Sequence, residues 1–148
     1  MIAVLQRVSR AEVRIGGAVV GRIGRGLVVL LAIERGDDST RLDGFSDKVL
    51  QVRVFDDNTG RMNLSARDVG AGLLVVSQFT LAADLSRGRR PGFEGAARPG
   101  VAEPLYEGFV ARLRTSGLTV ETGRFREHME VELVNDGPVT FVLRDQPR

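Results

Sequence analysis

Apolar and polar residues alternate with a period of two through much of the first 23 residues. The alternation covers residues 2–8, returns at 13–15 and is followed, after Gly16-Gly17, by the apolar-rich stretch 18–23. A period of two is typical of a half-buried strand, and Gly-Gly between two such runs is a hairpin signal. The chain then runs through seven consecutive apolar residues, 27–33, so we predict a hairpin followed by a central strand buried on both faces.

Two later segments change to helical spacing. Residues 39–51 place apolar side chains three or four positions apart, directly after the N-cap candidates Asp37 to Thr40, so we predict a helix there. A second helix is predicted after residue 100, with Pro104 in its first turn and Gly117 as its stop. The apolar face of that helix is expected to carry Val101, Leu105, Phe109, Val110 and Leu113.

The remaining apolar runs read as strands. They are residues 52–55, 73–76 with a continuation through 77–81, 118–120, 129–133 and 139–143. Strands grouped around two helices, rather than alternating strictly with helices, indicate the α+β class. We therefore predict a mainly antiparallel β-sheet or open β-barrel with two principal helices, and one domain over residues 1–148.

A Gly-Pro step separates the last two of these runs. Pro138 brings no N–H group to a sheet, and an X-Pro bond is the one peptide bond in which the cis form costs only about 0.5–1 kcal/mol. The segment Asn135-Asp136-Gly137-Pro138 is also what an ordinary turn or bulge looks like. From the local sequence, both a plain turn and a rigid cis device remain open.

Composition narrows the chemistry. The formal net charge is +2, there is no cysteine, and His128 is the sole histidine, so thiolate metal sites are excluded and no metal or cofactor is expected. No phosphate-binding or dinucleotide-binding glycine motif is present. The longest apolar run is too short to span a bilayer and the N-terminus lacks an export signal, so we expect a cytoplasmic protein without a membrane partner.

Arginines are concentrated in one irregular stretch. Residues 84–100 combine Arg87, Arg89, Arg90 and Arg98 with four glycines and two prolines, and loops of this length in compact domains are usually functional or mobile. Arginine presents a planar fork suited to phosphate oxygens, whereas a solvated loop is the plainer interpretation. The stretch is therefore a candidate nucleic-acid contact.

Three further positions are candidates for a site. Ser77-Gln78-Phe79-Thr80 stands at the end of a buried strand, where hydroxyls, an amide and backbone N–H groups can face a ligand. No base lies near it in sequence, so an activated Ser or Thr nucleophile is not indicated, and satisfied hydroxyls at a strand end are the structural alternative. His128 is interpreted as a surface side chain and Met129 as a core residue.

Six segments together resemble the D-aminoacyl-tRNA deacylase family in its bacterial and eukaryotic form, and the similarity extends to about residue 144. The two most specific are the Ser-Gln-Phe-Thr and Asn-x-Gly-Pro-Val-Thr segments, which occur in the expected order. The six segments are residues 1–8, 62–64, 75–82, 90–93, 122–125 and 133–140.

The resemblance implies a homodimeric hydrolase that cleaves the ester between a D-amino acid and the terminal adenosine of tRNA, and that also removes glycine from tRNA(Ala). It implies a cis Gly137-Pro138 bond that enters the partner's pocket and excludes L-amino acids, with Met129 packed in that pocket. By matching position, Ser77, Gln78, Phe79 and Thr80 line the site near the ester. Catalysis would be assisted by the tRNA's own 2′-hydroxyl.

One residue departs from the family pattern, and one rival function stays open. Gly92 stands in Arg-Pro-x-Phe where a serine is common, which puts in doubt any hydroxyl role at that position. The alternative is a non-catalytic RNA-binding module, in which the arginine-rich stretch docks nucleic acid and the Gly-Pro step is only a turn. It predicts salt-sensitive binding without turnover.

Overall fold

The fold is organised around one long strand. The computed structural model describes residues 1–145, and in them β1 runs for 14 residues and pairs with three other strands. The order of the main sheet is β2-β1-β3-β6-β7, with β8 paired to the other edge of β1. The bounds are β1 Ile2–Ile15, β2 Ala18–Ile23, β3 Gly26–Ala32, β6 Gly72–Ser77, β7 Val120–Thr122 and β8 Glu130–Arg144.

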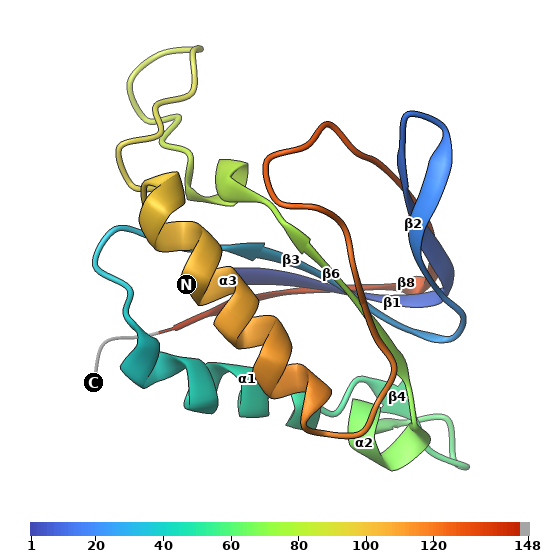
Figure 1. The fold of residues 1–148 in the computed structure, drawn as a ribbon. Helices are drawn as coiled ribbons and strands as arrows, with labels where there is room; N and C mark the ends of the chain where they lie inside the picture. The colour runs from blue at the N-terminus through green and yellow to red at the C-terminus, as the bar shows by residue number, and fades with distance from the viewer. Residues whose placement is uncertain (146–148) are drawn as a thin grey trace.

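The sheet is mixed and curls until its two sides nearly meet (Figure 1). β1 is antiparallel to β2, β3 and β8, whereas β3, β6 and β7 run parallel to one another. β2 crosses over β7 so closely that a Cβ on Gly21 would lie 2.6 Å from the carbonyl oxygen of Thr122. The predicted α+β class and open barrel are confirmed.

Two helices cover one face of this sheet (Figure 1). α1 follows the short turn η1, as the sequence indicated, and α3 lies beside it, with Phe45 and Phe109 in contact at 6.0 Å between ring centroids. The helical segments are η1 Ser39–Arg41, α1 Leu42–Gln51, α2 Ala66–Val69, η2 Phe79–Ala82 and α3 Pro99–Arg114. Burial of these apolar faces is the main force that holds the layers together.

The predicted central strand explains why the core has two parts. On β3, Leu27, Val29 and Leu31 point toward the helices and join the larger cluster. Val28 points to the opposite face and packs with Val8, inside the curl of the sheet. A strand with apolar residues on both faces packs against a hydrophobic core on each side, which is why the run 27–33 is apolar throughout.

The second helix differs from the prediction at its start. α3 begins at Pro99, whose missing N–H is no loss in the first turn, so Pro104 lies inside the helix rather than in its first turn. Val101 is exposed, and Ala102 and Tyr106 are buried instead, together with the predicted Leu105. The buried face therefore runs through Ala102 and Tyr106 and leaves Val101 at its edge.

Three strand boundaries were also wrong. The strand predicted at 73–76 ends at Ser77, and its predicted continuation through 81 is replaced by η2. The stretch predicted as strand 52–55 contributes only Phe55 to a two-residue strand, β4 Phe55–Asp56, which pairs with β5 Met62–Leu64 in a separate small sheet. The strand predicted at 118–120 begins at Val120. Residue 52 caps α1 through its N–H bond to the Lys48 carbonyl, so the chain is still leaving the helix there.

The last two apolar runs form one strand instead of two. β8 continues through the Gly-Pro step and pairs with β1 on both sides of it. Arg10 and Arg14 donate to the Glu132 carboxylate, which holds the pKa of Glu132 at about 2, and this ion pairing joins the outer faces of β1 and β8. No helix among residues 1–145 is long and apolar enough to cross a membrane.

Candidate functional site

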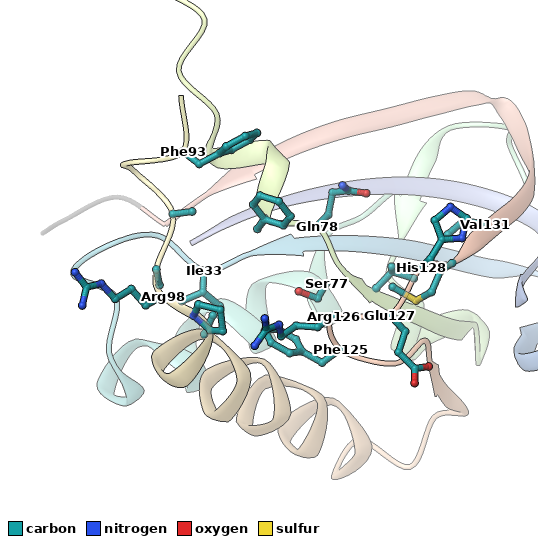
Figure 2. Close-up of a pocket in the computed structure, with 17 residues that line it drawn as sticks. Ile33, Ser77, Gln78, Phe93, Arg98, Phe125, Arg126, Glu127, His128 and Val131 are labelled. Carbon is teal, nitrogen blue, oxygen red and sulfur yellow. The ribbon is translucent and has the colours of Figure 1, made fainter. Parts of the chain in front are cut away.

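A cavity of about 670 Å³ opens where β6 ends (Figure 2). Its walls come from the end of β6 with η2, the first turns of α3 and the segment that leads into β8. Most of the lining is apolar, which is typical of a site that binds a small ligand or a nucleoside-sized group. The lining residues are Ile33, Val76, Ser77, Gln78, Phe79, Phe93, Ala96, Ala97, Arg98, Pro99, Ala102, Phe125, Arg126, Glu127, His128, Met129 and Val131.

Ser77, Gln78 and Phe79 from the predicted motif lie in the lining. The strand ends at Ser77 because η2 begins two residues later, and the Gln78 N–H donates to the Leu31 carbonyl at 2.8 Å, which fixes the turn on β3. No side chain caps η2, so its first backbone N–H groups remain available to a ligand. The rigid sheet thus presents one hydroxyl, one amide and main-chain donors to the cavity.

Thr80 does not line the cavity. It is exposed on η2, and its hydroxyl accepts a hydrogen bond from Gln78 Nε2 at 2.5 Å. In this chain the Thr80 side chain orients the Gln78 amide. Its place near the ester stays a prediction.

Two phenylalanines form the rim. Phe79 and Phe93 meet edge to face with 5.1 Å between ring centroids, and they are 55% and 42% exposed. Phe93 comes from the arginine-rich segment, so the sequence interval 84–100 contributes an aromatic group to the site as well as charge. Exposed aromatic pairs of this kind offer a flat surface on which a base can stack.

Met129 lies in the cavity wall. Its sulfur accepts from the Arg124 N–H at 3.4 Å. A Cβ on Gly123 would lie 2.4 Å from that sulfur, so any other residue at position 123 would displace the Met129 thioether. Behind the wall, Tyr106 contacts Phe125 and donates its hydroxyl to the Val75 carbonyl at 2.9 Å. Burial raises the pKa of Tyr106 to about 12, so this hydroxyl stays a donor.

Four titratable side chains line the cavity: Arg98, Arg126, Glu127 and His128. All four are exposed. Within the described residues neither Glu127 nor His128 is hydrogen-bonded to Ser77, so the hydroxyl in the cavity is not paired with a base. His128 is a surface side chain, as predicted. It lines the same cavity as Ser77, which the sequence did not indicate because the two residues are far apart along the chain.

Arg87, Arg89 and Arg90 lie away from the cavity. They are exposed on a loop that projects beyond the rest of the molecule between η2 and α3 (Figure 1). Two main-chain hydrogen bonds between Asp84 and Gly92, at 2.8 and 2.9 Å, close the base of this loop. The loop is therefore a distinct basic projection, while Arg98 is the member of the predicted cluster that lines the cavity.

The Gly-Pro step forms a bulge in β8. Four residues, 136–139, stand opposite the single residue Arg7 of β1, since Val8 pairs with Asn135 and Gln6 with Thr140. The Gly137-Pro138 peptide bond is cis, the geometry that the resemblance implied. Gly137 has φ +132°, which glycine alone adopts readily, and neither it nor Pro138 lines the cavity of its own chain.

Arg7 holds this bulge in place, and sequence reasoning did not identify it. Its guanidinium is buried and donates to the carbonyl of Asp136 at 3.1 Å and to that of Val54 at 2.9 Å, and it pairs with Asp56 at 3.2 Å. On the other side Asn135 Oδ1 accepts from the Val139 N–H at 2.9 Å. The available signal was a charged residue inside an otherwise apolar run, residues 1–5 and 8, of a buried strand.

No group of His, Cys, Asp and Glu within residues 1–145 is arranged to hold a metal ion. The cavity presents a hydroxyl, an amide, main-chain donors and exposed charges. Such a set can position an ester and stabilise a developing oxyanion.

A family model and individual relatives both assign the chain to the same family. Residues 4–144 match the family model described as D-Tyr-tRNA(Tyr) deacylase. The chain is 61% identical over 141 residues to a D-aminoacyl-tRNA deacylase of Symbiobacterium thermophilum, covering 95% of this chain and 93% of that protein. It is 56% identical over 144 residues to one of Shewanella amazonensis, covering 97% and 99%.

Two solved structures share the fold. One, described as a c-Myc DNA Unwinding Element Binding Protein, superposes with a TM-score of 0.93 at 39% identity and covers 99% of this chain and 100% of its own. The other, described as a probable eukaryotic D-amino acid tRNA deacylase, superposes with a TM-score of 0.86 over 96% and 97% of the two chains. At 18% identity the second supports the fold alone.

Replacing Arg7 tests the role of its buried guanidinium. We expect Arg7→Met to lower the free energy of unfolding by about 2–5 kcal/mol, because it leaves the Val54 and Asp136 carbonyls without their donor. Arg10→Met is the matched control on the same strand. Arg10 is exposed and, within residues 1–145, pairs with Glu132 alone, so its loss should cost less than about 1 kcal/mol. Urea denaturation of both variants measures the difference, and equal costs would contradict the role assigned to Arg7.

Proposed function

The chain belongs to the D-Tyr-tRNA(Tyr) deacylase family, and we propose that it edits tRNA by hydrolysing D-aminoacyl esters while rejecting L-aminoacyl esters by shape. It is a D-aminoacyl-tRNA deacylase and therefore a hydrolase, on the strength of the family match and of relatives that cover nearly the whole chain. The cavity at the end of β6 is the proposed active site. The cytoplasm, where charged tRNA is used, is its proposed place of action.

The observation that carries the mechanism is a cavity with ester-binding groups but no paired base. The Ser77 hydroxyl and the main-chain N–H groups at the start of η2 are suited to hold the ester carbonyl as negative charge develops. A proton acceptor for the attacking water is then best supplied by the substrate. We assign this task to the 2′-hydroxyl of the terminal ribose, beside the ester.

The Gly137-Pro138 step is the proposed chiral filter, and it is proposed to act in the partner subunit. Three features support this: the step is absent from the cavity of its own chain, it is exposed, and Arg7 holds it from beneath. Backbone carbonyls placed against the α-carbon would meet an L side chain with a steric and desolvation penalty. Glycine has no side chain to reject, so glycyl-tRNA(Ala) is a proposed second substrate.

The outer part of β8 is the proposed dimer surface. Val131, Val134, Phe141 and Val142 are exposed on this one strand, and β1 is the only strand within residues 1–145 that pairs with it. Exposed apolar side chains on an edge strand favour association with another chain. Because β8 also carries Gly137-Pro138, a dimer through this strand would bring the filter of each subunit near the other.

Nucleic-acid binding without turnover is the second candidate function. It is favoured by the basic projection at Arg87, Arg89 and Arg90, and one of the two similar structures is described as a protein that binds a DNA element. Deacylation distinguishes the two functions, since a binding module would show salt-sensitive affinity and no hydrolysis.

Paired substrates test the editing activity. D-tyrosyl-tRNA should be deacylated much faster than L-tyrosyl-tRNA, because only the L side chain would meet the proposed carbonyl barrier. Release of labelled tyrosine from each ester under single-turnover conditions measures the two rates. Similar rates on both esters would refute chiral selection, and no hydrolysis of either would favour the binding module.

The source of the catalytic base can be tested by one change in the protein and one change in the substrate. Thr80→Ala should stay within about tenfold of the wild-type kcat, because Thr80 only orients Gln78. D-tyrosyl-tRNA with a 2′-deoxy terminal adenosine should lose roughly 10²–10⁴-fold in rate if the 2′-hydroxyl assists. A loss of about 10⁴-fold in the Thr80 variant with little effect of the deoxy substrate would instead indicate a protein nucleophile.

A charge on β8 tests the dimer. Val142→Glu should dissociate the dimer and lower deacylation, because Val142 is 62% exposed in the proposed interface. Val19→Glu, a valine 41% exposed on β2, is the matched control and should leave both properties unchanged. Light scattering after size-exclusion chromatography reports the mass. A monomeric wild type, or equal effects of the two variants, would rule out this surface.

A further inference from the structure

Arg126 adopts a backbone conformation that its side chain does not favour. Its φ is +65°, and it is the only non-glycine residue within 1–145 with a positive φ. In this left-handed region the Cβ of an L-residue crowds the neighbouring carbonyl, whereas glycine has no such penalty. A long charged residue at a position suited to glycine points to a function for that side chain.

The side chain of Arg126 lines the cavity. In Figure 2 its guanidinium extends from the segment before β8 toward the first turns of α3. Within residues 1–145 it has no hydrogen bond and no ion pair, and the one acid in the lining, Glu127, lies 3.8 Å from Arg124 instead. The charge of Arg126 is therefore not neutralised by the protein.

Arg98 is the other arginine of the lining, but it is placed differently. It precedes Pro99 at the start of α3, and in Figure 2 its side chain extends outward, away from Ser77. The inner position is thus occupied by Arg126 alone among the described arginines of the lining.

We propose that Arg126 binds the last phosphodiester group of the substrate tRNA, the one that precedes the terminal adenosine. This inference rests on the proposed function: with the aminoacylated adenosine in the cavity, its 5′ phosphate must leave through the mouth. The arginine fork matches two phosphate oxygens, and such charge-assisted pairs are the stronger hydrogen bonds of a solvent-accessible site. Arg126 then positions the terminal nucleotide and takes no part in breaking the ester.

Two variants remove the charge with opposite effects on the backbone. Arg126→Gly removes the cation and relieves the left-handed conformation, so its melting temperature should equal or exceed that of the wild type. Arg126→Gln removes the cation and keeps a long side chain in that conformation. Arg67→Ala, which removes an arginine paired with Asp47 at 3.6 Å on α2, controls for net charge.

Each protein is assayed on D-tyrosyl-tRNA and on the 3′ D-tyrosyl ester of adenosine, which has no phosphate. Both Arg126 variants should raise KM for the tRNA by roughly threefold to tenfold, with kcat nearly unchanged. They should also lower the salt dependence of log(kcat/KM) by about 0.7–1. Rates on the adenosine ester should match the wild type, and Arg67→Ala should match it on both substrates.

Three outcomes would overturn the inference. Equal losses on the two substrates would place Arg126 in ester positioning or folding, and an unchanged KM for the tRNA would show that it contacts no phosphate. In both cases the wild type still deacylates D-tyrosyl-tRNA, so the proposed function stands. A wild type inactive on both esters would overturn the proposed function and this inference with it.

Discussion

The pairing of β1 with three strands is the constraint on which the rest of the structure depends. Its first half pairs with β3 along one edge, its second half pairs with β2, and β8 runs along the other edge. Hydrogen bonds between the strands and the alternation of side chains therefore fix the positions of both hydrophobic cores relative to β1. The place where this pairing fails, opposite Arg7, is where the chain forms the Gly137-Pro138 bulge.

Arg7 shows how such a failure is tolerated. The bulge leaves main-chain carbonyls without ladder partners, and the buried guanidinium supplies donors to one of them and to the neighbouring Val54 carbonyl. A guanidinium has five N–H donors in a fixed plane, so it can satisfy several acceptors at once where a lysine could not. The carbonyls of the bulge thus have a rigid support. Under the proposed function this rigidity is required, because a barrier that moved would admit the wrong isomer.

The sequence predicted what depends on local periodicity. The hairpin at Gly16-Gly17, the central strand 27–33 and the helix over 39–51 follow from spacing and turn chemistry, and the structure confirms them. Periodicity did not indicate the role of Arg7, because its partners are the carbonyls of Val54, just before β4, and of Asp136 in β8, far away in sequence. The same holds for His128 and Arg126, which reach the cavity only because β7 is hydrogen-bonded beside β6.

The sequence predicted which residues form the site but not how they are arranged. In the structure they lie in two separate places. Ser77 to Phe79 and Met129 share one cavity, whereas Gly137-Pro138 lies outside it, held by Arg7 and the edge of β4. The cavity residues and the Gly137-Pro138 bulge can act on one substrate only if the bulge of a second subunit lies at the cavity of the first. Under the proposed function, assembly and chirality are then the same requirement: a lone subunit would have the ester-binding groups but no means to distinguish D from L. Under the same proposal the filter acts before any chemistry does, so discrimination between the isomers needs no base paired with Ser77 in the cavity.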